Sequence, residues 1–234
     1  MWRLSLPGSK HWRWCVLGER TLLFEWREGE PFSRLKMKRL IAGWENWDYP
    51  EVEEVVPGYT SVAVWFKAEF ATTDMERVVQ DFFDRLPGIG FDPNTSGNRI
   101  DIPVCYSMGL DWDEVQDQTG RTMTEIIDRH SAAEYEVAMV GFLPGFMYLE
   151  GLDPLLYCPR KATPRVRVPE GSVGIGGHQT GVYSFPTPGG WQIIGKTPLH
   201  LFNEEKEPPV SVAVGDVIRF VPINEQQYEE MTRG

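Results

Sequence analysis

Residues 141–202 read GFLPGFMYLEGLDPLLYCPRKATPRVRVPEGSVGIGGHQTGVYSFPTPGGWQIIGKTPLHLF, and this stretch decides the fold of the C-terminal half. Glycine and proline interrupt almost every short apolar run in it. Helices do not tolerate that spacing, because proline lacks a backbone donor and glycine adds backbone freedom. Short strands joined by tight turns do tolerate it. The stretch therefore predicts a β-rich unit whose turns carry polar side chains, which is a common way to build a site.

The residues on either side of this stretch predict the rest of the same unit. Strands are expected at residues 100–106, 135–142 and 216–221, and the polar tail from residue 223 is expected to fray. Two helices are expected between the first two strands, because Asp111 with Glu114 and Thr122 with Glu125 have the spacing of N-terminal capping boxes. We place this unit at residues 99–234.

The N-terminal third predicts a smaller α+β unit at residues 1–91. Strands are expected at 13–17, 21–26, 52–56 and 61–66. Met37, Leu40, Ile41 and Trp44 share one face of a helix, and a second helix follows a capping box at Thr73 and Glu76. This order favours helices on one face of an antiparallel sheet. The turn-rich segment 91–98 (FDPNTSGN) separates the two units.

Composition narrows the class of protein. The chain has 234 residues, 41% of them hydrophobic, with 23 Lys plus Arg against 34 Asp plus Glu and a net charge of −11. This balance argues against a general nucleic-acid binder, which needs a basic face, but it does not exclude a small anionic substrate.

Three cysteines, Cys15, Cys105 and Cys158, form no C-x-x-C pair, so neither a disulfide framework nor a structural zinc site is indicated. No signal peptide is evident, and no apolar run approaches the roughly 20 residues that span a bilayer. We expect a soluble cytoplasmic protein that contacts no membrane.

Residues 190–197 (GWQIIGKT) match the P-loop pattern G-x-x-x-x-G-K-[ST] letter for letter. A P-loop needs a tight phosphate-binding turn with a helix starting at its Lys-Thr end. Here Trp and two Ile fill the loop and prefer a strand, and Pro198 follows at once. We interpret the segment as a strand that ends in a turn.

The motifs between residues 100 and 222 resemble those of the 5-oxoprolinase B-subunit family, also described as Kip-type kinase inhibitors and allophanate hydrolase subunit 1. The matching stretches are 102–106 (IPVCY), 130–131 (HS), 141–146 (GFLPGF), 151–154 (GLDP), 159–165 (PRKATPR), 168–175 (VPEGSVGI), 177–181 (GHQTG), 188–191 (PGGW) and 195–198 (GKTP). The N-terminal third resembles the family more loosely, at 18–23 (GERTLL) and 56–61 (VPGYTS).

The resemblance implies a ferredoxin-like N-terminal domain and a cyclophilin-like β-barrel C-terminal domain. It also implies that the polypeptide is one part of an enzyme that cleaves 5-oxoproline to glutamate with ATP and Mg²⁺. The implied partners are the C subunit of that enzyme, which has a homologous barrel, and its A subunit. No cofactor is expected on this chain alone.

Candidate site residues follow from the motifs. We expect catalytic roles for His130, Arg165 and Gln179, and substrate contacts from Arg160, His178, Thr180 and Lys196. Arginine can hold a carboxylate bidentately, and glutamine can donate to and accept from a lactam at once. Each has a structural alternative. His130 could be a packed helix-end histidine, and residues 177–181 could be a plain hairpin turn. Arg160 and Arg165 could form an internal ion pair that fixes their loop, with Asp153 as the candidate partner.

Phosphorylation of the lactam oxygen followed by addition of water would couple ATP to ring opening. Such chemistry needs cationic and amide donors around the developing charge. Arg165, Gln179 and Lys196 are the expected donors, although Lys196 stands where the family commonly has arginine. Two alternatives stay open at this point: a component of a urea carboxylase or allophanate hydrolase system, and an inhibitor that binds a sensor histidine kinase.

Overall fold

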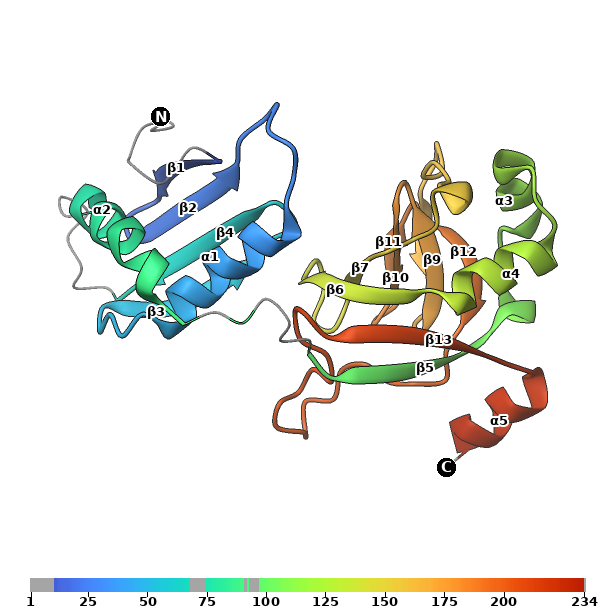
Figure 1. Cartoon of the computed structure of the whole chain (residues 1–234). Helices are drawn as coiled ribbons and strands as arrows, with labels where there is room; N and C mark the ends of the chain where they lie inside the picture. Colours follow the sequence, from blue (N-terminus) through green and yellow to red (C-terminus); the bar gives the residue numbers. More distant parts are fainter. Residues whose placement is uncertain (1–10, 68–74, 91, 93–96, 234) are drawn as a thin grey trace. The chain divides into compact units, whose positions relative to one another are not determined.

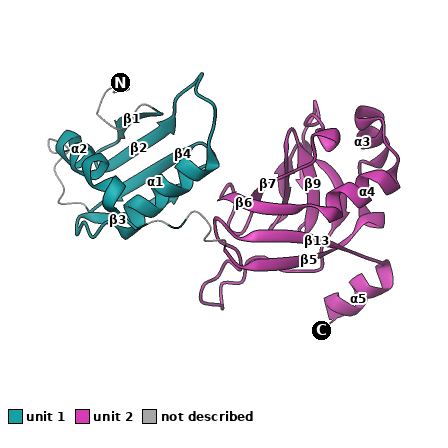
Figure 2. Cartoon of the chain, in the orientation of Figure 1, with its two compact units in different colours: residues 1–95 teal, residues 96–234 magenta. Residues whose placement is uncertain are grey.

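The chain forms two compact units, residues 1–95 and 96–234, in a computed structural model (Figure 2). The structure describes residues 11–67, 75–90, 92 and 97–233. The division lies inside the turn-rich segment 91–98, most of which is outside the described residues.

The first unit is a four-stranded antiparallel sheet with two helices on one face (Figure 1). Its elements are β1 (Trp12–Leu17), β2 (Thr21–Trp26), α1 (Arg34–Asn46), β3 (Val52–Pro57), β4 (Ser61–Phe66) and α2 (Met75–Arg85), and the sheet order is β1-β2-β4-β3. Trp44 of α1 stacks on Phe82 of α2 with ring centroids 4.0 Å apart, and both pack on Phe24 of β2. The periodicity of the sequence predicted these elements. Thr73, the expected cap of α2, lies outside the described residues.

The second unit is a closed barrel of seven strands in the order β10-β7-β6-β13-β5-β12-β9. The strands are β5 (Arg99–Cys105), β6 (Glu134–Val140), β7 (Met147–Glu150), β9 (Ser172–Gly176), β10 (Gln179–Val182), β12 (Gln192–Lys196) and β13 (Val217–Ile223). Two further strands, β8 (Arg165–Val168) and β11 (Thr187–Gly189), form a separate two-stranded sheet. Residues 192–196 of the P-loop-like segment are thus strand β12, as its β-branched residues predicted.

Among the described residues, three α-helices accompany the barrel: α3 (Trp112–Thr119), α4 (Met123–Ala132) and α5 (Glu225–Arg233). The capping box of Thr122 and Glu125 at the start of α4 is confirmed. The capping box expected at Asp111 and Glu114 is wrong, because Asp111 stands at the N-cap of α3 but makes no capping hydrogen bond. The tail expected to fray is also wrong, since it forms α5 after reciprocal hydrogen bonds between Asn224 and Gln227.

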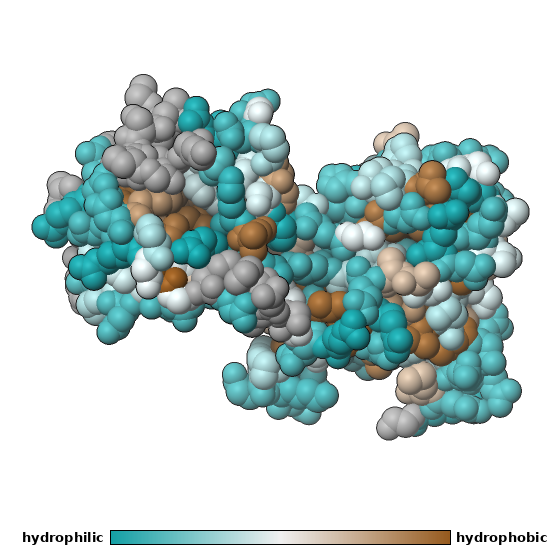
Figure 3. All heavy atoms as spheres, in the orientation of Figure 1, coloured by the Kyte–Doolittle hydropathy of each residue, from teal (hydrophilic) through white to brown (hydrophobic). Residues whose placement is uncertain are grey.

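The barrel unit contains two hydrophobic clusters. The larger one fills the interior and includes Tyr106, Tyr135 and Phe220. A smaller one gathers Phe146, Val168, Tyr183, Trp191 and Ile193. Hydrophilic residues dominate the face drawn in Figure 3, where hydrophobic patches are small and separate. None of the described helices has the length and apolar character that a membrane crossing requires.

Candidate functional site

A chain of hydrogen bonds runs through the barrel interior and includes two of the candidate residues, His130 and Thr180. The Tyr106 hydroxyl lies 2.7 Å from His130 Nδ1, and His130 Nε2 lies 2.9 Å from Thr180 Oγ1. Thr180 Oγ1 donates to the carbonyl of Gly174 at 3.0 Å. Because the threonine proton is used there, its oxygen accepts from Nε2–H, and Nδ1 accepts from Tyr106. The contacts thus fix the neutral Nε2–H tautomer.

His130 is fully buried, and its ring stacks on Phe220 with centroids 4.6 Å apart. Burial lowers the pKa of His130 from 6.5 to about 3, since the imidazolium would lose its hydration inside the barrel. Proton exchange near neutral pH, the catalytic role expected from the sequence, does not fit this position. Thr180 is also fully buried, so neither side chain offers a hydrogen bond to a ligand.

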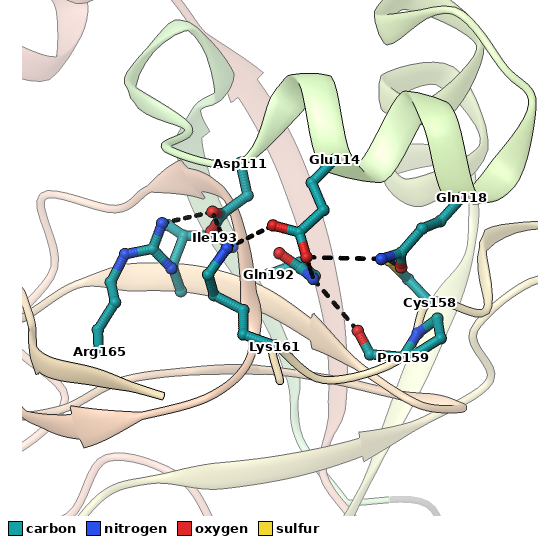
Figure 4. A network of polar contacts seen from close by, with 9 residues as sticks. All are labelled: Asp111, Glu114, Gln118, Cys158, Pro159, Lys161, Arg165, Gln192 and Ile193. Atoms are coloured by element: carbon teal, nitrogen blue, oxygen red, sulfur yellow. Dashed lines mark hydrogen bonds and ion pairs between the residues drawn. The ribbon is translucent and has the colours of Figure 1, made fainter. Parts of the chain in front are cut away.

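Arg165 belongs to a second network, which joins α3, the segment 158–165 and β12 (Figure 4). Asp111 is only 5% exposed, and one oxygen of its carboxylate accepts from Arg165 Nη2 and from Lys161 Nζ, the latter at 3.1 Å. The other oxygen accepts from the amide of Ile193 at 2.6 Å. Burial raises the pKa of Asp111, but the hydrogen bonds from Arg165, Ile193 and Lys161 outweigh it, so the pKa lies below its ordinary value.

Arg165 therefore forms an internal ion pair, which was the structural alternative to a catalytic role. Its partner differs from Asp153, the residue expected from the sequence. Its partner is Asp111, whereas Asp153 pairs with Arg129 at 2.8 Å. One nitrogen of Arg165, Nη1, is buried and has no partner among the described residues. The position of the guanidinium is thus determined largely by Asp111, and Nη1 stays unused.

The network continues through side chains that sequence reasoning missed. Glu114 accepts from Lys161 and, at 2.8 Å, from the fully buried Gln192, whose amide also donates to the Pro159 carbonyl at 3.3 Å. The thiol of Cys158 donates to Gln118 at 2.7 Å, and burial raises its pKa to about 11. The signal in the sequence was the pair Asp111 and Glu114, which have capping-box spacing but bind across the fold.

The remaining candidates stand apart from this network. Gln179 is 8% exposed and lies opposite Gly176 in the pairing of β10 with β9. His178 is exposed in the turn before β10, and its ring is 6.2 Å from that of Tyr157. Lys196 ends β12, with its Nζ 5.8 Å from the ring centroid of Tyr228 in α5. Lys196 contacts α5, whereas Arg165 contacts Asp111 at the start of α3. These contacts do not place the two cations close together.

Arg160 has a different environment from Arg165. Its side chain is exposed, and its guanidinium lies over the Trp191 ring, 5.8 Å from the centroid. Trp191 lies against the barrel wall because glycine is present there: a Cβ on Gly176 would come within 2.3 Å of the indole nitrogen. The rings of Phe146 and Tyr148 meet the Trp191 ring edge-on at 5.5 and 5.7 Å. This arrangement holds a cation at the surface on a rigid aromatic base.

Part of the chain matches the family model described as "Carboxyltransferase domain, subdomain C and D", over residues 12–212. Three curated relatives are each named as the B subunit of 5-oxoprolinase. The protein from Bacillus subtilis is 40% identical over 79% of this chain and 81% of its own length. The one from Escherichia coli O157:H7 is 40% identical over 91% and 97%, and the one from Haemophilus influenzae is 47% identical over 73% and 79%.

Solved structures share the fold. The protein TTHA0988 aligns with a TM-score of 0.72 and 29% identity, over 87% of this chain but only 40% of its own. The Kluyveromyces lactis urea amidolyase aligns with a TM-score of 0.78 over 99% of this chain and 16% of its own, and at 20% identity this likeness shows the fold alone. The fold thus also occurs as a part of much longer chains.

Proposed function

The chain belongs to the family of carboxyltransferase domains, subdomains C and D, and to the 5-oxoprolinase B-subunit proteins within it; on that premise we propose that it is the B subunit of ATP-dependent 5-oxoprolinase. The reaction opens the lactam of 5-oxoproline and gives glutamate. The observation that carries the proposal is that three curated relatives bear this name and are matched over most of their length.

The A and C subunits of 5-oxoprolinase are the proposed partners of this chain. A protein named as a subunit is one part of an assembly. The matched region makes up only 40% of the TTHA0988 chain, so in that protein it is covalently joined to further sequence. Both the subunit name of the relatives and the longer TTHA0988 chain fit a site that is complete only when a partner protein covers this chain's surface. The C subunit, with its homologous barrel, is the proposed neighbour of this barrel.

ATP with Mg²⁺ is a substrate of the proposed complex rather than a ligand of this chain. The segment with P-loop spelling is strand β12, which is not followed by the helix that a phosphate-binding loop needs. The described residues contain no group of three or more His, Cys, Asp or Glu side chains that could hold a metal ion. The P-loop spelling therefore does not mark a phosphate-binding loop, and we propose that a partner subunit binds the nucleotide.

For ring opening, this chain supplies cationic and amide donors. Positive charge and N–H groups stabilise the oxygen that becomes negative as the lactam carbon is attacked. The unused Nη1 of Arg165, Gln179 and Lys196 are the proposed donors, and the exposed Arg160 and His178 are further substrate contacts. Thr180 and His130 support these donors indirectly, because their hydrogen bond links β10, which also contains Gln179, to α4.

The two fold names implied by the sequence are proposals too. A ferredoxin-like domain has the order βαββαβ, whereas the first unit has the order ββαββα. Moving the last strand of the former to the front gives the latter, so we propose a permuted ferredoxin-like domain. For the seven-stranded barrel we propose the cyclophilin-like class.

Reconstitution tests the function. Purified chain mixed with the A and C subunits should release glutamate from 5-oxoproline with ATP, and omission of any one of the three proteins should abolish release. Gln179→Ala should lower turnover without unfolding the protein, with the exposed His200→Gln as a control. Absence of release from the complete mixture would refute the proposal, and capture of a histidine kinase or turnover of urea would instead favour one of the alternative functions.

A further inference from the structure

The anchoring of Arg160 begins with its backbone. Cys158 and Gly177 exchange two backbone hydrogen bonds, of 3.1 and 2.7 Å, on one side of Arg160. On the other side, the amide of Lys161 donates to the carbonyl of Gly190 at 2.7 Å. The segment that carries Arg160 is thus tied to the barrel and to the residue before Trp191. A donor fixed in this way loses little entropy when it binds a ligand.

Arg160 also lacks the carboxylate partner that several other arginines of this unit have. Arg165 pairs with Asp111, Arg129 with Asp153 and Arg219 with Asp101. Arg160 makes no ion pair with any residue that the structure describes. In a chain with a net charge of −11, an exposed cation held over an aromatic ring without a counter-ion is available to an anion.

Tyr148 adds a hydroxyl to the aromatic cluster on which this cation lies. Its ring packs on Phe146 and Trp191, and its hydroxyl has no hydrogen-bond partner among the described side chains and backbone. The Tyr148 ring and the Arg160 guanidinium both lie against the Trp191 ring, and burial raises the pKa of Tyr148. Tyr148 is thus protonated at neutral pH and can donate a hydrogen bond.

Phe142 stands at the edge of the same aromatic cluster and is 60% exposed. Its ring meets that of Phe146 edge-on at 5.5 Å, and its φ of 73° is in the left-handed region that an aromatic residue rarely adopts. Strain of this kind persists where the surroundings hold it, and it concentrates at ligand sites. An exposed ring at this position can form an apolar wall for a small cyclic ligand.

We propose that Arg160, Tyr148 and Trp191, here called the Arg160 platform, bind the carboxylate of the cyclic amide substrate, with Phe142 beside the ring. The guanidinium and the Tyr148 hydroxyl donate hydrogen bonds to the carboxylate. The Trp191 ring supports the guanidinium as a cation–π partner. This assignment rests on the proposed function. It separates recognition of the carboxylate, at the platform, from the Asp111 network, where Arg165 is already paired.

The first test uses the reconstituted complex. Its probes are 5-oxoproline and the neutral amide of 5-oxoproline, in which a carboxamide replaces the carboxylate. Arg160→Gln should raise the KM for 5-oxoproline about 10- to 100-fold, the loss expected for a charge-assisted hydrogen bond. It should leave the inhibition constant of the amide unchanged. Arg160→Lys should lose less, because it keeps the charge without the fork, and Tyr148→Phe should raise the KM by a smaller factor.

Arg167→Gln is the matched control, because Arg167 is an exposed arginine of β8. This variant should leave the KM for 5-oxoproline and the inhibition constant of the amide unchanged. If Arg160→Gln weakens binding of 5-oxoproline and of its amide equally, or weakens the binding of neither, then the platform does not bind the carboxylate.

The second test needs no turnover and uses the chain alone. In NMR spectra of the full chain, 5-oxoproline should shift the Trp191 indole resonance at concentrations at which its amide does not, and Arg160→Gln should abolish the shift. An equal shift by both compounds, or none by either, overturns the inference. Failure of the complex to release glutamate would instead refute the proposed function, and the acid-selective shift would still decide the role of the platform.

Discussion

His130 shows at the residue scale how a plausible catalytic group becomes structural. Its two ring nitrogens are both satisfied, by Tyr106 and by Thr180, and Phe220 covers one face. A buried imidazole with these partners ties three elements together only while it is neutral. The sequence showed a histidine near the end of a helix, which fits both roles, but it did not show that the barrel closes over the ring.

The low pKa of His130 predicts a pH dependence of stability. In the unfolded chain His130 titrates near 6.5 and in the folded chain at about 3, so the unfolded state binds more protons between these values. The stability that this group contributes is therefore complete above pH 6.5 and is lost as the pH falls, by up to about 1.4 kcal/mol per pH unit. Urea unfolding at pH 7, 6 and 5 measures the slope. His130→Asn should flatten it and His200→Gln should not; equal slopes in all three proteins would contradict the burial of a neutral imidazole.

Phe142 allows the backbone strain to be separated from the aromatic ring. Phe142→Ala and Phe142→Gly both remove the ring, but only glycine adopts a φ of 73° at no steric cost. The glycine variant should therefore be more stable than the alanine variant by about 1 kcal/mol, as measured by thermal unfolding. In the reconstituted complex both variants should raise the KM for 5-oxoproline alike. Alanine and glycine variants of equal stability would mean that position 142 is not strained.

At the element scale, α3 is held to the barrel by charge as well as by apolar packing. Asp111 at its start binds the amide of Ile193 in β12 and two cations of the segment 158–165. The sequence correctly predicted that a helix starts at Asp111. It wrongly predicted a capping box between Asp111 and Glu114, whose side chains instead bind residues of other elements. A capping box is a local pattern, whereas these contacts join residues far apart in the sequence, and only the closed barrel brings them together.

Removal of the Asp111 carboxylate should loosen this junction. Asp111→Ala leaves Lys161 and Arg165, which are about three-quarters buried, without their shared counter-charge. We expect a loss of about 3 kcal/mol in the free energy of unfolding, in the range measured when one partner of a buried ion pair is removed. Asp113→Asn, two residues along and exposed, should change it by less than about 0.5 kcal/mol. Equal losses in both variants would mean that the carboxylate at 111 is not a structural centre.

Most elements were predictable because their patterns are local. Alternation along β4 and the i, i+3, i+4, i+7 spacing of α1 each predicted the buried face that the structure has. Helix α5 was missed because none of its residues is buried, so the tail gave no apolar signal, and its cap at Asn224 was overlooked. The Arg160 platform was not predictable either, since Tyr148 lies in β7 and Trp191 lies in the bend before β12, far apart in the sequence.

At the scale of the whole molecule, each unit has hydrophobic clusters of its own. The aromatic cluster around Trp44 and Phe82 contains only residues of the first unit, and the clusters around Tyr135 and Trp191 contain only residues of the second. Every residue of the Arg160 platform and of the Asp111 network also belongs to the second unit. Independent cores imply that each unit can fold without the other.

The barrel unit should therefore fold by itself. A fragment of residues 97–234 should unfold in one cooperative transition, because it keeps the closed barrel and both of its clusters. Its Trp191 indole resonance should respond to 5-oxoproline as it does in the full chain, since every donor of the platform is retained. The matched control is the same fragment with Arg160→Gln, which should fold equally well and lose the response. A folded fragment that lacks the response would show that the first unit supplies part of the site, and a fragment that does not fold would show that the barrel depends on the first unit for its stability.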